Sequence, residues 1–230
     1  MRNRAGHPPP EREAAAPLVR PEALAYRGRG QMSPGQEGSR LPKLLIIIAS
    51  TRPGRVGLPV GRWLQQVAIR HGGFGVEVAD LAEIGLPFMD EPHHPRLHRY
   101  THAHTKAWSR QVGSADAFAF VMPEYNYGFT APLKNALDYL HQEWNHKPVG
   151  LVSYGGIAAG TRAQQLLKPV LSALRLNPTG ESVMIPFVAR FVENGEFHPE
   201  ETVERSALAM LDELVRLTAA LAPLRAPADA

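Results

Sequence analysis

The run LLIIIA at residues 44–49 restricts the fold most strongly, because it is continuously apolar and β-branched at its centre. Such a run is typical of a strand covered on both faces, as the strands of a parallel sheet are. After a loop at residues 50–57, apolar side chains recur every three to four positions between Val60 and Ala68, which predicts a helix. A buried strand followed directly by a helix favours an α/β fold.

The same alternation continues along the chain. Apolar segments predict four further strands, at residues 76–81, 117–121, 149–152 and 182–188. Helical spacing predicts helices over residues 100–114, from Pro132 onward, over 161–174 and over 200–221. The third of these could be interrupted at Pro169. Five strands that alternate with helices predict a doubly wound, five-stranded parallel sheet with helices on both faces.

Residues 1–40 differ from the rest in composition. They contain six Pro and five Gly and no sustained apolar period, so we predict a disordered Pro/Gly/Arg-rich N-terminal extension and one folded domain at residues 41–225. We favour a dispensable extension, with Met32 as an alternative start, over a basic tethering arm. Its seven Arg and four Glu account for the whole net charge of +3, so the remainder is formally neutral. A neutral domain is poorly suited to binding nucleic acid.

The chain contains no cysteine. This excludes disulfides, iron–sulfur clusters, thiolate zinc sites and cysteine nucleophiles, so any redox chemistry needs a bound cofactor. No apolar stretch approaches the roughly 18–20 residues that span a bilayer. The N-terminus lacks the apolar core of a secretory signal, so we expect a cytoplasmic protein without a membrane partner.

Ligands of open α/β sheets bind outside the carboxyl ends of the strands, so the loops that follow the buried strands matter most. The first loop, residues 50–57, offers the hydroxyls of Ser50 and Thr51 and the guanidinium groups of Arg52 and Arg55 at the start of a helix. These groups favour a phosphate site over a merely solvated turn. The loop has neither the Gly-Lys-Ser/Thr of nucleotide hydrolases nor the G-x-G-x-x-G of dinucleotide-binding dehydrogenases.

Two more loops carry ligand-type residues. The second loop, residues 122–128, holds two tyrosines that could line a flat aromatic ligand or only pack onto the sheet. The third loop, residues 153–156, ends in paired glycines that let a ligand approach the backbone, although an ordinary glycine turn looks the same. Together the three loops predict one groove, with a phosphate socket at one end and a backbone-lined slot at the other.

The loops and their flanking residues resemble the NADPH-dependent FMN reductase family, a flavodoxin-like group that includes quinone, azo-dye and chromate reductases. The matching stretches are KLLIIIASTRPGRVG, MPEYNYGFTAPLKNALDYL and PVGLVSYGGIAAGTRA, and the resemblance covers residues 42–190. It implies a flavodoxin-like fold, FMN and NADPH as cofactors, and a homodimer or higher homo-oligomer.

The resemblance also implies site residues. The FMN phosphate would be bound by Ser50, Thr51, Arg52, Arg55, Val56 and Gly57. The ribityl chain and isoalloxazine would be bordered by Pro123, Glu124, Tyr125 and Asn126, and the third loop would contribute Tyr154, Gly155 and Gly156, the two glycines at the pyrimidine edge. Two positions depart from the family pattern: Gly57 stands where many members carry Ser, and Ala159-Gly160 stands where many carry Gly-Gly.

The implied activity is hydride transfer from NADPH through FMN to a small-molecule acceptor, in a ping-pong mechanism. Flavin, quinone, azo compound and metal oxyanion all stay open as acceptors. The protein supplies binding and electrostatics rather than a dedicated acid or base, so we name no catalytic residue; N–H groups of Gly155 and Gly156 would stabilise negative charge on the reduced flavin. A flavodoxin-type electron carrier and a flavin-bound redox sensor are the alternatives.

Two further features need an interpretation. Arg162 could bind the phosphate of NADPH or be an ordinary surface arginine of its helix. His94, His98 and His102 are spaced i, i+4, i+8, which would place them on one face of a helix and could bind zinc. Within the crowded segment from His93 to His104, we favour a surface loop and helix at the rim of the site over a metal centre.

Overall fold

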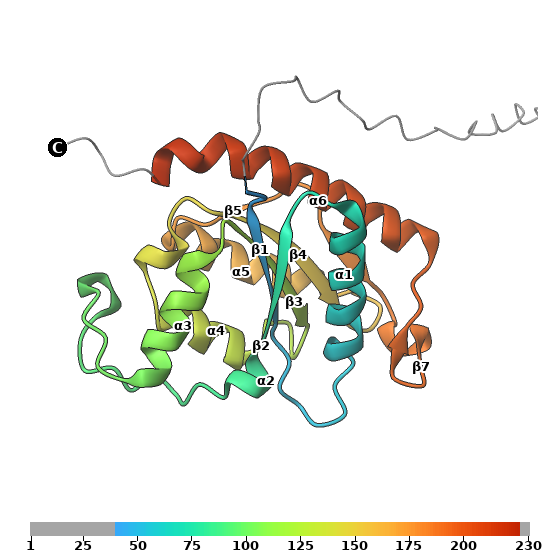
Figure 1. The fold of residues 1–230 in the computed structure, drawn as a ribbon. Coiled ribbons are helices and arrows are strands. Elements are labelled where there is room, and N and C mark those ends of the chain that lie inside the picture. Colours follow the sequence, from blue (N-terminus) through green and yellow to red (C-terminus); the bar gives the residue numbers. More distant parts are fainter. Residues whose placement is uncertain (1–39, 226–230) are drawn as a thin grey trace, which may run out of the picture. The chain divides into compact units, whose positions relative to one another are not determined.

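The computed structural model describes residues 40–225. The predicted extension therefore lies outside the described residues, apart from Arg40. The described chain is an α/β fold with a parallel sheet between two layers of helices (Figure 1). Because each apolar strand is followed by an amphipathic helix, helices cover both faces of the sheet.

The strands lie in the order β2-β1-β3-β4-β5, which is the flavodoxin-like order. The bounds are β1 (Lys43–Ile48), β2 (Gly75–Asp80), β3 (Ala117–Pro123), β4 (Pro148–Tyr154), β5 (Asn177–Pro178) and β6 (Val183–Ile185). Both β5 and β6 pair with β4 in parallel, so two short strands share the fifth position. Between them, the N–H groups of Gly180 and Glu181 donate to the carboxylate of Glu213, at 2.9 and 2.8 Å. The fifth strand, predicted at residues 182–188, is thus limited to β6 at Val183–Ile185 and is shorter than expected.

The two faces of the sheet hold separate layers of core. Leu44 and Ile46 pack with α1 and α6, whereas Leu45 and Ile47 pack with α3, α4 and α5 (Figure 1). The bounds are α1 (Gly57–His71), α3 (Ala103–Ser114), α4 (Ala131–Asp138), α5 (Thr161–Ala173) and α6 (Glu201–Leu221). Alternate side chains of one strand point to opposite faces, which explains why the run at residues 44–49 is apolar throughout.

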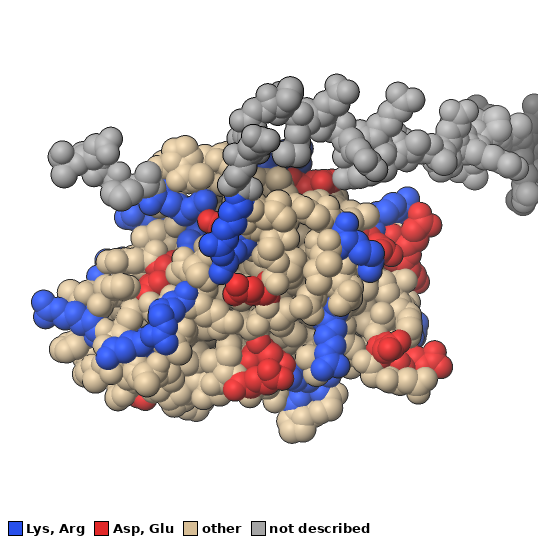
Figure 2. Space-filling view, viewed as in Figure 1, with Lys and Arg blue, Asp and Glu red and all other residues tan. Residues whose placement is uncertain are grey.

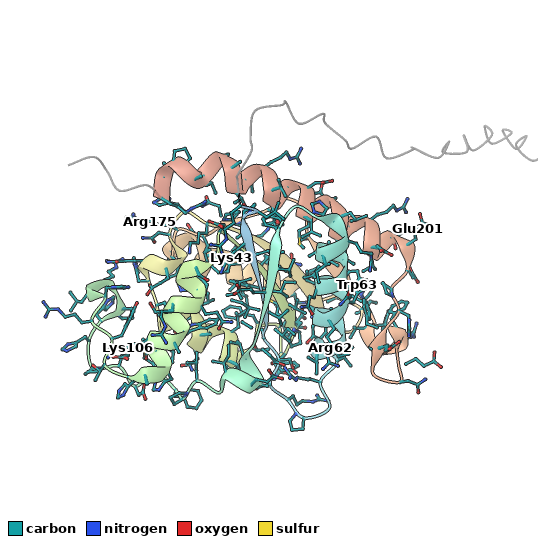
Figure 3. The ribbon with its side chains drawn as sticks, viewed as in Figure 1. Lys43, Arg62, Trp63, Lys106, Arg175 and Glu201 are labelled. Atoms are coloured by element: carbon teal, nitrogen blue, oxygen red, sulfur yellow. The ribbon has the colours of Figure 1, made fainter. Side chains whose placement is uncertain are left out.

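Several elements differ from the sequence prediction. The helix expected from residue 100 begins only at Ala103, and α5 continues through Pro169 without interruption. The short elements α2 (Leu81–Ile84), η1 (Pro95–Leu97), η2 (Gln142–Trp144), η3 (Val188–Phe191) and η4 (Ala222–Arg225) and the hairpin of β7 (Val192–Glu193) and β8 (Glu196–Phe197) were not predicted. The hairpin packs on α1 through Trp63, whose ring meets that of Phe197 edge-on at 5.2 Å (Figure 3).

Lys and Arg alternate with Asp and Glu over the face shown in Figure 2. Between residues 40 and 225, no helix has the length and hydrophobicity needed to cross a membrane.

Candidate functional site

The first, second and third loops follow β1, β3 and β4, which are neighbours in the sheet. Their direct contacts show that they meet. The Ser50 hydroxyl lies 3.1 Å from the Tyr125 hydroxyl, which joins the first loop to the second. The N–H of Glu124 donates to the carbonyl of Tyr154 at 3.0 Å, which joins the second loop to the third. The three segments that were predicted to form one groove are therefore in contact at the carboxyl edge of the sheet.

The first loop ends in a helix start that has no cap. The helix α1 begins at Gly57, its N-cap residue Val56 makes no side-chain hydrogen bond, and its first turn holds no acidic residue. The N–H groups of Val56, Gly57 and Leu58 donate to no described residue. Thr51 and Arg52 are exposed beside them, and the guanidinium of Arg52 pairs with none of the residues described. Unpaired N–H groups at a helix start, with a free cation next to them, form an anion site.

Arg55 has a different position from Arg52. Its guanidinium donates to both carboxylate oxygens of Asp80 at 2.5 Å, and to the carbonyl of Ser50 at 2.7 Å. Hydrogen bonding to Asp80 raises the pKa of Arg55 above its ordinary value. The pair is almost covered, with 13% and 5% of the side chains exposed. Arg55 thus braces the loop against β2, and Asp80 offsets the charge that was expected to meet phosphate.

Asp80 is a site residue that our sequence analysis did not identify. It is the last residue of β2, level with Ile48 of β1, and it also caps α2 by accepting from the N–H of Ala82 at 3.0 Å. Its position at the carboxyl end of a predicted strand was a usable signal, because such ends meet at one edge of the sheet.

The second loop is a tight turn with exposed rings. Tyr125 and Gly128 exchange two backbone hydrogen bonds of 2.9 Å, and Asn126 and Tyr127 have positive φ angles of 48° and 72°. Tyr125 and Tyr127 are 42% and 65% exposed, so the rings do not simply pack onto the sheet. Pro123, by contrast, is buried as the last residue of β3. The loop therefore leaves two aromatic rings accessible, as a flat ligand requires.

Arg162 joins the second loop to the start of α5. Its guanidinium lies 2.6 Å from one carboxylate oxygen of Glu124, and its N–H donates to the other at 3.1 Å. The same guanidinium stacks over the ring of Tyr127, 4.2 Å from the centroid. Arg162 therefore has interaction partners in the second loop and is not an ordinary surface arginine. Its expected contact with NADPH stays a prediction.

The third loop is partly engaged. The N–H of Gly155 donates to the carbonyl of Ile185 at 3.3 Å, whereas the exposed Gly156 has an N–H that donates to no described residue. The side chain of Tyr154 belongs to the core layer under α1, and its buried hydroxyl has no hydrogen-bond partner in the described part of the chain. The loop thus leaves one backbone donor for a ligand, where two were expected.

The histidine helix predicted from residue 94 is not present. His94 caps the short helix η1, His98 ends it with a φ of 53°, and His102 is the N-cap of α3. The three residues therefore share no helix face, and the expectation of an i, i+4, i+8 arrangement was wrong. Within residues 40–225, no three metal-binding side chains lie close enough to hold an ion.

A cavity of about 430 Å³ opens beside the first loop, and our sequence analysis did not identify it. It is lined by Thr51, by Leu81, Ala82, Gly85, Leu86, Pro87 and Phe88 after β2, and by Ala131, Pro132 and Asn135 of α4. Most of these side chains are apolar, and Phe88 is 85% exposed. The cavity suits an uncharged ligand better than an ion.

A family model described as NADPH-dependent FMN reductase matches residues 42–190. The chain belongs to the NADPH-dependent FMN reductase family. It is therefore an oxidoreductase of a family that uses FMN and NAD(P)H. The three stretches quoted from the sequence all lie within the matched range.

Individual relatives agree with this assignment. An NAD(P)H-dependent FMN reductase of Schizosaccharomyces pombe is 42% identical over 149 residues, which are 63% of this chain and 74% of that protein. An NAD(P)H:quinone oxidoreductase of Solanum tuberosum is 40% identical over 68 residues, which are 28% of this chain and 35% of that protein. The flavoenzyme FerB, an NAD(P)H:(acceptor) oxidoreductase of Paracoccus denitrificans, shares the fold, with a TM-score of 0.62 at 19% identity over 78% of this chain and 98% of that one.

The described residues fit FMN. A phosphate monoester would meet unpaired N–H groups at the start of α1, next to the exposed Arg52. The second loop exposes two tyrosine rings, and Gly156 offers one backbone donor beyond them. The socket, the aromatic faces and the free donor lie on loops that contact one another, as a ligand with a phosphate and a flat ring needs.

Proposed function

We propose that this chain binds FMN in the groove of the three loops and uses it to pass hydride from NADPH to a small uncharged acceptor. The observation that carries this proposal is the uncapped start of α1, where Val56, Gly57 and Leu58 keep unpaired N–H groups. A helix start left without partners indicates a site that an anionic ligand completes.

Each part of the groove has a separate task in this proposal. The N–H groups of the first loop, with the hydroxyls of Ser50 and Thr51 and the charge of Arg52, hold the phosphate. Pro123, Glu124, Tyr125 and Asn126 border the ribityl chain and the ring, and Arg162 keeps Glu124 in place through the 2.6 Å ion pair. Arg55 acts through its bonds to Asp80 and Ser50, which fix the path of the loop.

Bound FMN supplies the redox chemistry, because it can accept a hydride and release it to a second substrate. The chain supplies position and electrostatics. The N–H of Gly156 donates to no described residue, and in this proposal it stabilises negative charge on the flavin without any titrating side chain. The N–H of Gly155 would have to leave Ile185 to join it.

The cavity beside the first loop supports a flat, uncharged acceptor. Its lining of Leu81, Leu86, Pro87, Phe88 and Pro132 offers apolar contacts and no cation for an oxyanion. We therefore favour a quinone, a flavin or an azo compound over a metal oxyanion. We propose that the nicotinamide and the acceptor enter this cavity in turn, because a single shared site gives a ping-pong mechanism.

We also propose a homodimer or higher homo-oligomer. Phe88 is 85% exposed and Leu166 of α5 is 55% exposed, and these are the apolar side chains that we expect a subunit contact to cover. A cytoplasmic location stays a prediction from the sequence.

An anaerobic reduction experiment tests the function. FMN-loaded protein is mixed with NADPH, and the flavin absorbance is followed near 450 nm, an approximate value for the oxidised cofactor. We expect rapid bleaching that a quinone reverses and that chromate reverses far more slowly. Tight FMN binding without bleaching by NADPH or NADH would favour a flavodoxin-type electron carrier. Failure to bind FMN would contradict the site assignment.

A further inference from the structure

The hydroxyl of Tyr154 lies at the start of α1, in the space that a side chain at position 57 would fill. A Cβ atom built on Gly57 would lie 2.4 Å from the Tyr154 hydroxyl oxygen, 3.2 Å from the Cβ of Ser50 and 3.4 Å from the Tyr154 ring carbon that bears the hydroxyl. The first distance is shorter than real Cβ contacts, so any larger residue at position 57 would have to displace the hydroxyl.

This hydroxyl is also without a partner. Tyr154 is only 3% exposed, and no described group lies in hydrogen-bonding geometry with its oxygen, although the side chain of Ser50 is close enough to lower the pKa of the phenol. Leaving a buried hydroxyl unpaired costs on the order of 1–3 kcal/mol, so natural proteins rarely do so unless a ligand or an ordered water completes the site. Its neighbours are the residues that build the phosphate socket, Gly57 and Ser50.

The hydroxyl can act as a donor at neutral pH. Burial is the main cause that raises the pKa of Tyr154 well above its usual value, and the nearby Ser50 and Arg55 only partly oppose it. The phenol therefore keeps its proton and offers an O–H beside the unpaired N–H groups of Val56, Gly57 and Leu58.

We propose that Tyr154 donates this hydrogen bond to the phosphate of FMN and so replaces the side-chain hydroxyl that Gly57 lacks. Gly57 and Tyr154 are then a matched pair: the glycine leaves the space, and the tyrosine places its oxygen there from β4. The assignment moves Tyr154 from the ring end of the groove, where its loop lies, to the phosphate end. It rests on the proposed function, since it requires FMN as the ligand.

Comparing FMN with riboflavin isolates the contact, because riboflavin has the same ring and no phosphate. Apo protein with Tyr154→Phe is titrated with each flavin, and binding is followed by quenching of flavin fluorescence. We expect the FMN dissociation constant to rise about 10- to 100-fold, the range for a hydrogen bond to a charged group, and that for riboflavin to stay unchanged. The melting temperature of the apo protein should stay the same or rise, because the unpaired hydroxyl is gone.

A second pair of variants tests the exchange of hydroxyls directly. Gly57→Ser alone should weaken FMN binding, because its side chain collides with the Tyr154 oxygen. In the Tyr154→Phe background the ring carbon is 3.4 Å from the new Cβ, an ordinary contact, so the serine should fit once the Cβ of Ser50, at 3.2 Å, gives by a few tenths of an ångström. The double variant should recover the preference for FMN over riboflavin to within about threefold of the original protein, a coupling expected only of residues in contact.

Tyr100→Phe is the matched control, because it removes a tyrosine hydroxyl that bonds to Glu143 outside the groove. It should leave the FMN preference unchanged. The inference is overturned if Tyr154→Phe keeps that preference, or if it weakens FMN and riboflavin equally, which would mean that the hydroxyl only supports packing. If the original protein binds neither flavin, the proposed function itself fails.

Discussion

The polar groups at the two ends of the sheet differ in whether they have hydrogen-bond partners. At the carboxyl end, the first loop leaves the N–H groups of Val56, Gly57 and Leu58 without partners. At the amino end, Glu143 accepts from Tyr100 at 2.8 Å and from Ser109 at 2.6 Å. Unpaired donors make a structure less stable but ready for a ligand, whereas paired groups stabilise it and bind nothing.

The same contrast occurs within the first loop. Arg52 and Arg55 are three positions apart, yet Arg52 is exposed and unpaired among the described residues, whereas Arg55 is locked to Asp80. One arginine is available to a ligand, and the other holds the loop in place for it. We expect mutations of the paired groups to affect folding first, and mutations of the unpaired groups to affect only binding.

Removing Asp80 should have the largest effect. Asp80→Ala leaves the guanidinium of Arg55 buried without its partner, so we expect a loss of about 3–5 kcal/mol in the free energy of unfolding, measured by urea denaturation. Asp80→Ala combined with Arg55→Met should recover most of this loss, because no charge is left buried. The control Asp138→Ala removes an exposed ion pair with Lys134 and should cost less than about 1 kcal/mol. Equal losses in Asp80→Ala and Asp138→Ala would show that the Arg55 pair is not a brace.

Removing Glu143 tests the amino end of the sheet. Glu143→Ala leaves the hydroxyls of Tyr100 and Ser109 without an acceptor, and we expect a loss of about 2–4 kcal/mol in the free energy of unfolding. The FMN dissociation constant of the folded variant should not change, because the side-chain partners of Glu143 belong to none of the three loops. Glu196→Ala, at a side chain that is 79% exposed, is the control and should be neutral. If Glu143→Ala changed the FMN affinity without lowering the free energy of unfolding, the amino end would serve binding rather than stability, and the contrast between the two ends would be wrong.

Lys147 gives this region a pH signature. Burial lowers the pKa of Lys147 to about 8, helped by Arg225 and opposed by Asp116 and Glu143. Because the folded pKa lies below the unfolded one, the unfolded state binds more protons between about pH 8 and 10.5. The free energy of unfolding should therefore rise with pH in that window, by up to about 2 kcal/mol, since the bonds of the ammonium to the carbonyls of Val112 and Gly113 offset part of the shift.

Lys147→Met should remove that rise, which is measured by urea denaturation at intervals of pH. Lys106→Met is the control, because Lys106 is exposed on α3 (Figure 3) and should keep the pH profile of the original protein. If the free energy of unfolding depended on pH in the same way in Lys147→Met and in the original protein, groups other than Lys147 would cause its rise.

The sequence predicted the strands and the three loops well, because both follow from local patterns. Continuous apolar runs mark buried strands, and the strand order then brings their carboxyl ends together. The prediction of a histidine helix was wrong because η1 ends at His98, whose φ of 53° lies in the left-handed region, so no helix joins His94 to His102.

Contacts between distant residues could not be predicted from the pattern. Nothing in the loop itself distinguishes Arg52 from Arg55, and Asp80, 25 positions after Arg55, decides which one is paired. The side chain of Tyr154 could have been placed: alternation along β4 puts it on the same face as Val152, under α1 rather than in the third loop.

The smallest expected effect belongs to Arg52, the unpaired cation of the first loop. Arg52→Gln removes one positive charge beside the phosphate socket, and the exposed position keeps the interaction screened by water. We expect the FMN dissociation constant to rise about 3- to 10-fold at low salt and less at high salt, with no change for riboflavin or in the urea midpoint. Arg110→Gln, an exposed arginine of α3, is the control for the loss of charge alone. If Arg52→Gln lowered the free energy of unfolding and left FMN binding intact, Arg52 would stabilise the fold rather than bind the ligand. The distinction between paired groups that stabilise this loop and unpaired groups that bind the ligand would then be wrong.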